Sequence, residues 1–240
     1  MRSYTRHQLK QDSFTTSTAE TITWAVEHRS KLIAAGVALA VILAVLGGGW
    51  AYVSYRDQQA SAELAQAIQK YNTPVRPAGT PATPDVPSYA STQERDKTTN
   101  AEFNRIANKY SFTQSAQVAR YFAAITARDL GDNATAEKDL QQVAGSRYPE
   151  IASLAKIALA GVYHDTNRNS QAVDLYKQLI DHPTASVGKS AAQLALASLY
   201  ESMDQPNDAR HIYEQMQKDS PGTAVAQLAM QRLQALGKQP

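Results

Sequence analysis

A pattern that returns every 36 to 37 residues limits the fold of this chain more than any other feature. The segment YHDTNRNSQAVDLYKQL starts at Tyr163, and YESMDQPNDARHIYEQM starts 37 residues later, at Tyr200. They share few polar residues, but both have Tyr at the first place, Ala at the tenth and Tyr at the fourteenth. A third, more divergent copy, ARDLGDNATAEKDLQQV, covers residues 127–143. Such a period predicts a stack of similar units, each covering the hydrophobic face of the next.

Each unit is predicted to be two helices joined by a polar turn. Two antiparallel helices approach closely only where the side chains between them are small, and large apolar groups one turn away fill the space beside the crossing. Strand patterns are scarce after residue 92, so an all-α solenoid is expected. Prolines 149, 183 and 221 are predicted to mark the starts of the first helices. The second helices repeat an alanine followed four residues later by a large side chain, at Ala136, Ala172 and Ala209 with Leu140, Tyr176 and Tyr213.

These positions resemble the tetratricopeptide repeat, whose usual period is about 34 residues. The resemblance implies a domain at residues 92–236. A lead-in helix is expected at Asn100–Tyr110. The aromatic residue that the family carries near the start of each first helix is missing, and Arg120, Lys156 and Gln193 lie near that place. The expected units are three repeats and a capping helix, at about 116–148, 149–183, 184–220 and 221–236.

The segment LIAAGVALAVILAVLGGGWAYVSY, residues 32–55, has 24 residues and no charge. As a helix it would rise about 36 Å, enough to cross a hydrocarbon core of about 30 Å. It is longer than the apolar part of a signal peptide, which has about 7–15 residues, and a buried core helix of this length would carry more polar residues. We therefore expect a single N-terminal transmembrane helix, with Trp50, Tyr52 and Tyr55 at a lipid interface.

The leader before the span, residues 1–31, contains five Lys and Arg residues. Positive charge favours the cytoplasmic side, so we expect an inside tail, one pass through the cytoplasmic (inner) membrane, and a periplasmic or extracytoplasmic C-terminal domain. The leader sequence STAETITWAVEHR fits either a short surface helix or a disordered tail. Within the span, a ridge of small residues would allow contact with another membrane helix and hence an oligomer, with chance alignment as the alternative. The ridge consists of Gly36, Ala40, Ala44 and Gly48.

Two segments connect the span to the repeats. Residues 56–71 are rich in helix formers and are predicted to continue the membrane helix as a stalk. Residues 72–91 hold five of the ten prolines in the chain. Their spacing predicts an extended polyproline II linker, with a docking site for a proline-binding partner as the alternative.

Composition and motifs argue against an enzyme. The chain has no cysteine, which excludes disulfides, a thiol nucleophile and zinc–thiolate sites. Residues 57–240 carry 18 Lys and Arg against 19 Asp and Glu, so no nucleic-acid partner is expected. The five histidines lack metal-binding spacing, and VGKSAA, residues 187–192, lacks the first glycine and the strand of a phosphate-binding loop. No catalytic, metal or cofactor-binding residue is therefore predicted.

The inner face of the first helices is the expected protein-binding groove. The Lys and Asn residues with which some tetratricopeptide domains clamp a peptide carboxylate are absent from this face, so that binding mode is excluded. The face suits apolar or unfolded segments, or a partner helix, whereas the alternative is that its residues are simply part of the core. The candidate groove residues are Tyr121, Ile125, Ile157, Leu194 and Ser198.

The order of tail, single span, stalk and C-terminal repeats is similar to the ancillary subunit of the Sec translocon. This resemblance implies a non-enzymatic, membrane-anchored scaffold whose partners are the translocon, envelope chaperones or exported polypeptides. The Pro-rich segment and the 31-residue leader depart from that family. An envelope-assembly or cell-division scaffold, and a platform associated with an enzyme, remain as alternatives.

Overall fold

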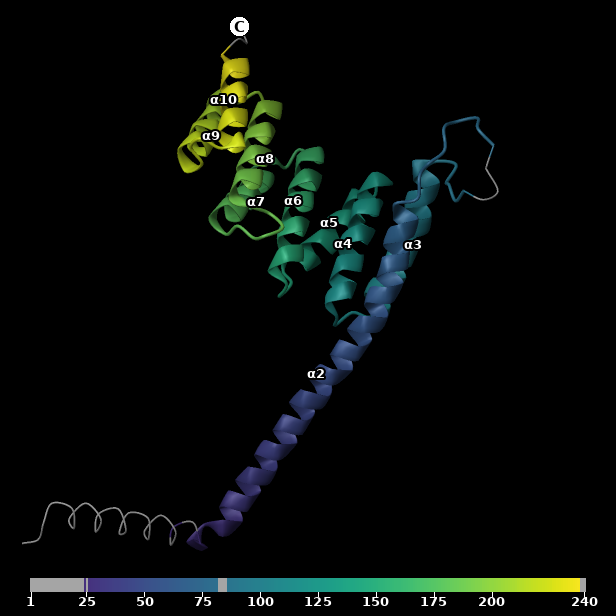
Figure 1. Ribbon diagram of the computed structural model, residues 1–240, viewed down its shortest axis with the longest axis vertical. Helices are drawn as coiled ribbons and strands as arrows, with labels where there is room; N and C mark the ends of the chain where they lie inside the picture. Colours follow the sequence, from purple (N-terminus) through teal and green to yellow (C-terminus); the bar gives the residue numbers. More distant parts are fainter. Residues whose placement is uncertain (1–23, 25, 82–85, 238–240) are drawn as a thin grey trace, which may run out of the picture. The chain divides into compact units, whose positions relative to one another are not determined.

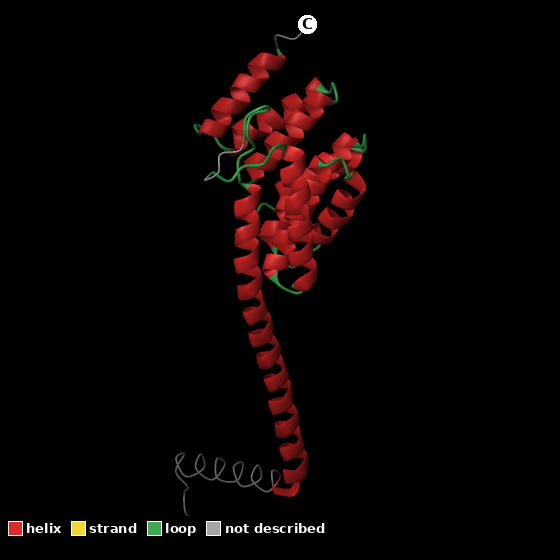
Figure 2. Ribbon diagram, turned by 90° about the vertical axis from the view of Figure 1, so that its right-hand side faces the viewer, coloured by secondary structure: helices red, strands yellow, loops and turns green. Residues whose placement is uncertain are grey.

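The computed structural model describes residues 24, 26–81 and 86–237, and within them it contains helices and no strand longer than an isolated bridge (Figures 1 and 2). Most of the inside tail predicted for residues 1–31 lies outside the described residues. The chain divides into two compact units, Met1–Ser54 and Tyr55–Pro240. The helices in order are α2 (Arg29–Tyr71), α3 (Thr92–Lys109), α4 (Gln114–Asp129), α5 (Asn133–Ala144), α6 (Pro149–Asp165), α7 (Asn169–Asp181), α8 (Lys189–Ser202), α9 (Pro206–Asp219) and α10 (Ala224–Leu236).

In the first unit, α2 carries the apolar segment. Residues 29–52 of this helix are all exposed, and none of its most apolar part is buried. By length and composition, this helix could cross a membrane. Gly36 and Gly48 have open space where a side chain would point, so the small-residue ridge is accessible to another helix. Contact of this ridge with a second membrane helix stays a prediction.

The second unit is a stack of helix pairs. α4 packs with α5, α6 with α7, and α8 with α9, while α10 covers α9 at the C-terminal end (Figure 1). Each pair coincides with one period of the sequence pattern. The all-α solenoid predicted from that pattern is therefore confirmed.

The repeated alanines lie where the helices of a pair cross. They have no exposed surface, and the first helices supply equally buried alanines at positions 124, 160 and 197. Leu140 and Tyr213 are fully buried one turn further on, while Tyr176 is half-buried. Because a larger group at the crossing would separate the two backbones, packing explains why these positions recur while others vary. The buried alanines of the second helices are Ala136, Ala172 and Ala209.

The polar turn inside each repeat has one backbone geometry. Gly131, Asn167 and Asp204 have φ of 85°, 58° and 56°, the left-handed region. The next residue in each turn donates its N–H to a carbonyl five residues back, with distances of 2.9, 2.7 and 2.9 Å. This hydrogen bond and a left-handed residue define a Schellman helix end. Gly, Asn and Asp tolerate that conformation best, which explains their recurrence in the turn.

The positions that lack the family's aromatic residue carry polar contacts instead. Arg120 donates to Asp139 of α5 at 3.1 Å, in an ion pair that is mostly buried. Lys156 donates to Gln178 of α7 at 3.3 Å, one repeat later. The third member of the series is Gln193, which donates to Asp219 of α9 at 2.9 Å. In each repeat, a polar side chain therefore links the first helix to the second where an aromatic residue would pack.

Residues 56–71, predicted to be a stalk, are instead one helix of an additional pair. Ala60, Leu64 and Ala67 are buried, and they share a hydrophobic cluster with Phe103 of α3 and Ala116 of α4, among others. The residues that a stalk would leave in water therefore form part of a core. Their spacing of three and four residues is that of an apolar helix face, but the sequence does not name the partner of that face.

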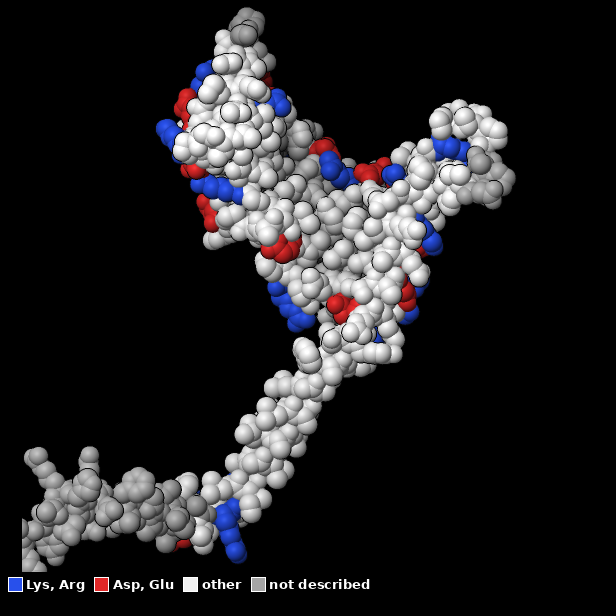
Figure 3. All heavy atoms as spheres, in the orientation of Figure 1, with Lys and Arg blue, Asp and Glu red and all other residues white. Residues whose placement is uncertain are grey.

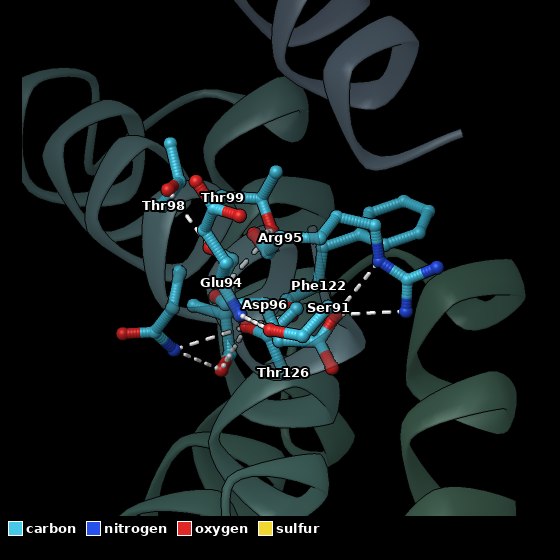
Figure 4. A network of polar contacts seen from close by, with 10 residues as sticks. Ser91, Glu94, Arg95, Asp96, Thr98, Thr99, Phe122 and Thr126 are labelled. Carbon is cyan, nitrogen blue, oxygen red and sulfur yellow. Dashed lines mark hydrogen bonds and ion pairs between the residues drawn. The ribbon is translucent and has the colours of Figure 1, made fainter. Parts of the chain in front are cut away.

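The Pro-rich segment also differs from the predicted extended spacer. Tyr89 donates its N–H to the carbonyl of Pro74 at 3.1 Å, and Arg76 donates to the carbonyl of Tyr89 at 3.0 Å. These bonds hold the two ends of the segment side by side, so it closes as a loop between α2 and α3. Helix α3 then starts at Thr92, well before the lead-in helix expected at 100–110, because Ser91 caps it by accepting from the N–H of Glu94 (Figure 4).

The prolines mark helix starts less regularly than predicted. Pro149 is the first residue of α6, but α8 begins at Lys189 and α10 at Ala224, several residues after Pro183 and Pro221. A loop precedes α8, and the Glu150 carboxylate holds it by accepting from the N–H of Ser186 at 2.6 Å. This anchored loop is the reason that α8 begins late.

Glu63 joins α2 to α3 and offers a test of this additional pair. It accepts from Lys109 at 2.7 Å, Tyr110 at 2.8 Å and Arg105 at 2.7 Å. These hydrogen bonds, first those from Lys109 and Tyr110, lower the pKa of Glu63 from 4.5 to about 2. A lowered pKa gives stability that is complete above the ordinary value and lost as pH falls towards the folded-state value.

We therefore predict that Glu63→Gln lowers the free energy of unfolding at neutral pH, and that the difference from wild type shrinks as pH falls from 4.5 to about 2. Urea unfolding of both proteins, followed by circular dichroism at each pH, measures this difference. The other carboxylates titrate in the same way in both proteins, so their contributions cancel in the difference between the two free energies of unfolding. A difference that stays constant over that pH range would show that Glu63 does not join the helices.

Candidate functional site

The candidate groove is a stripe that repeats on α4, α6 and α8. On α4, positions 121, 125 and 128 lie on one face because they are four and three residues apart. The equivalent positions are 157, 161 and 164 on α6, and 194, 198 and 201 on α8. Figure 3 shows the surface of the Tyr55–Pro240 unit hollowed between the C-terminal helices and the end of α2, with acidic and basic side chains on its floor.

The apolar members of the stripe are half-buried. Tyr121, Ile125 and Leu194 pack against the edge of the main core, whereas Ile157 packs against a smaller cluster around Leu179 and Val187. Ser198 is exposed. All five predicted groove residues therefore keep surface that a ligand could cover, and four of them also contribute to packing.

Tyr121 is the largest of these side chains. Its ring meets Phe122 edge-on, with 5.5 Å between the ring centroids. Burial raises the pKa of the Tyr121 hydroxyl, which therefore stays neutral at physiological pH. Tyr121 thus offers an apolar ring with a neutral hydroxyl, a combination common in protein-binding surfaces.

Beside the apolar members, Arg128 links the first two repeats. It donates to one oxygen of Asp165 from Nε at 2.9 Å and from Nη2 at 2.7 Å. Its guanidinium lies over Gly161, where an added Cβ would be 3.1 Å from Nη1. The missing side chain at residue 161 therefore leaves room for the arginine to cross α6.

The next repeat boundary has a related contact. His164 corresponds to Arg128 in the period, and its Nε2 lies 3.4 Å from the hydroxyl of Ser202 on α8. The other ring nitrogen, Nδ1, lies 2.8 Å from the side-chain oxygen of Asn169. Polar contacts thus accompany the apolar stripe at both repeat boundaries. The polar side chains that make them could pair with the backbone of a bound polypeptide.

The sequence analysis did not identify the Arg128–Asp165 contact as part of the candidate surface. It also missed Arg95, which pairs with the buried Asp96 at 2.8 Å (Figure 4). Arg95 also lies over the Tyr71 ring, 4.9 Å from its centroid. The only sequence signal for the first contact is Gly161, a glycine where the other repeats have Ile125 and Ser198.

Catalytic chemistry finds little support in the described residues. Among them, no group of three or more His, Asp or Glu side chains could hold a metal ion. A hollow of about 620 Å³ lies beside α7, α8 and α9, and its lining includes Lys189, Gln193 and Asp219 but no nucleophile paired with a base. Gln193 Oε1 is buried there without a hydrogen-bond donor.

A comparison with models of known protein families identifies the family of this chain. A family model described as a tetratricopeptide repeat-like domain matches residues 24–238. The chain belongs to this tetratricopeptide repeat-like family. The match includes the apolar part of α2 as well as all the described repeats.

One solved structure shares the tetratricopeptide-like fold. It is a candidate kinesin light chain from Podospora anserina with nearly identical TPR-like repeats, at a TM-score of 0.54 and 14% identity, and the alignment covers 75% of this chain and 86% of that chain. At this identity the likeness shows the fold alone. A comparison with curated proteins found no match.

Gly161 allows a test of the contact between Arg128 and Asp165 in this tetratricopeptide repeat-like chain. We predict that Gly161→Ala displaces the flexible end of Arg128 and uncouples it from Asp165. Alanine is favoured over glycine in a helix by roughly 0.5–1 kcal/mol, and an exposed ion pair is worth about 0.2–1 kcal/mol, so the overall stability should change little.

The measurement is a double-mutant cycle on the free energy of unfolding. Asp165→Asn should destabilise the wild type and have no effect in the Gly161→Ala background. An equal cost of Asp165→Asn in both backgrounds would show that Arg128 does not depend on the glycine.

Proposed function

We propose that this chain is a non-enzymatic scaffold that binds polypeptide segments on the inner face of its repeats. It is anchored in the cytoplasmic membrane by residues 32–55, with its repeat domain outside the cytoplasm. Its partners are exported polypeptides, envelope chaperones or the Sec translocon. The ridge from Gly36 to Gly48 serves as a contact for a second membrane helix.

The observation that carries the proposal is the mixed chemistry of the inner face. Tyr121, Ile125 and Leu194 are half-buried apolar side chains of the stripe that also carries Arg128, which pairs with Asp165. Apolar side chains of a ligand would cover the first group, and its backbone N–H and C=O groups would find partners in the second. Grooves that bind extended or helical segments combine these two features.

The membrane anchor has separate support. The apolar part of α2 buries nothing within the described residues, and the family match includes it. The five positive charges of the leader favour the orientation with the N-terminus inside. The link to export rests on the similarity of the architecture to the ancillary subunit of the Sec translocon.

We predict that replacing Tyr121, Ile157 and Leu194 together by Ser weakens partner capture. The changes remove apolar surface from three consecutive repeats. The matched control replaces exposed second-helix residues at equivalent places of the same repeats, namely Lys138, Asp174 and His211, by Ser. Crosslinking in native membranes, followed by identification of the partners, measures capture, and circular dichroism checks folding.

A folded triple variant that still captures the wild-type partners at full yield would move the binding site elsewhere. Loss of capture in both triple variants would show that the effect is not specific to the inner face.

Orientation gives a second prediction. A reporter that is active only after export, fused behind Pro240, should be active, and a cytoplasmic reporter at the same place should be silent. The reason is the excess of positive charge before the span. The opposite pattern of reporter activity would place the repeat domain in the cytoplasm and exclude the proposed envelope partners.

A further inference from the structure

Phe112 is unusually exposed. It lies in the turn between α3 and α4, and its relative exposure of 82% is the highest among the large hydrophobic side chains that the structure describes. The turn holds it in place, because the Thr113 hydroxyl donates to the carbonyl of Tyr110 at 2.9 Å and accepts from the N–H of Ala116 at 3.1 Å. Phe112 is thus held out into solvent by a capped helix start.

The turn is attached to the residues that directly follow the apolar span. Arg56 donates from Nη2 to the carbonyl of Lys109, and the Asp57 carboxylate accepts from the N–H of Ser115 at 2.9 Å. These two bonds lie on either side of Phe112 in the sequence. Figure 1 shows the turn between α3 and α4 beside this part of α2.

Arg56 and Asp57 are also the first charged residues after the span. The uncharged segment ends at Tyr55, so an inserted span places Arg56 and Asp57 at the lipid headgroups. No linker separates that point from the folded unit, because Ala60 is already buried in it. The turn that contacts Arg56 and Asp57 must then lie close to the bilayer surface.

We propose that the α3–α4 turn is a second membrane contact, in which Phe112 inserts into the interfacial region of the bilayer beside the end of the span. The proposal rests on the membrane anchor of the proposed function. Trp and Tyr favour this region, and Trp50, Tyr52 and Tyr55 lie at the end of the span. Phe is among the apolar side chains that membrane-surface segments bury at the same depth.

Charges around the turn suit a lipid surface. Lys109 and Arg105 both pair with Glu63, yet their side chains remain 46% and 55% exposed. Long basic side chains can keep an ion pair on one side and reach phosphate groups on the other. A lipid surface also fits better than a protein groove, because the apolar contact is a single side chain next to an existing membrane entry point.

The absence of cysteine allows a clean test on the full chain. Single cysteines are introduced at Ser111, next to Phe112, at Leu130, at the other end of α4, and at Leu43, within the span, and each is labelled with an environment-sensitive fluorophore. The proteins are reconstituted into vesicles of phosphatidylethanolamine and phosphatidylglycerol. Iodide quenches labels in water, and nitroxide-bearing lipids quench labels in the bilayer.

The expected result is a shift of the Ser111 label to shorter wavelength, loss of its iodide quenching and a gain of lipid quenching. The Leu130 label should stay open to iodide. Phe112→Ser should return the Ser111 label to water, and its high exposure makes this change harmless to folding, which circular dichroism confirms. Phe112→Trp should keep the label protected.

Several outcomes would overturn the proposal. A Ser111 label that is open to iodide while the Leu43 label is lipid-protected overturns the second contact and leaves the membrane anchor intact. A Leu43 label that is open to iodide overturns the anchor itself. Protection that survives Phe112→Ser excludes Phe112 as the contact, and protection that vanishes on dilution of protein in lipid shows a second copy of the chain instead.

Discussion

Close approach of paired helices is the constraint on which the rest of this structure depends. Six alanines at the crossings are fully buried, three from the first helices and three from the second. They let the backbones approach, and this brings Leu140, Tyr213 and their equivalents into contact beside each crossing. The candidate groove borders these crossings, because Tyr121, Ile157 and Leu194 each lie one helical turn before a crossing alanine and are half-buried.

Polar contacts replace apolar packing at several repeat positions. The links from Arg120, Lys156 and Gln193 join the two helices of a repeat where the family uses an aromatic residue. Breaking a buried ion pair such as Arg120–Asp139 leaves a charge without a partner, which is costly. These side chains thus restrict how each pair can be arranged, and Arg128 and His164 do the same between repeats.

Helix α2 combines two roles that the sequence presents as separate segments. Its apolar part could cross a membrane, and residues 56–71 complete an additional helix pair with α3. The repeat domain therefore begins where the apolar segment ends, and Glu63 ties α2 to α3 through three donors. This direct connection, instead of a free stalk, underlies the proposed contact of the α3–α4 turn with lipid.

The sequence by itself determined the helical class, the period, the alanine crossings and the polar turns, because each depends on local spacing and on the conformations that Gly, Asn and Asp allow. It did not determine what residues 56–71 pack against, how the Pro-rich segment closes, or that Arg128 crosses Gly161 to reach Asp165. Those features join residues that are distant in the chain, and an apolar face or a charge does not specify its partner until the helices are stacked. Only the tertiary structure decided them.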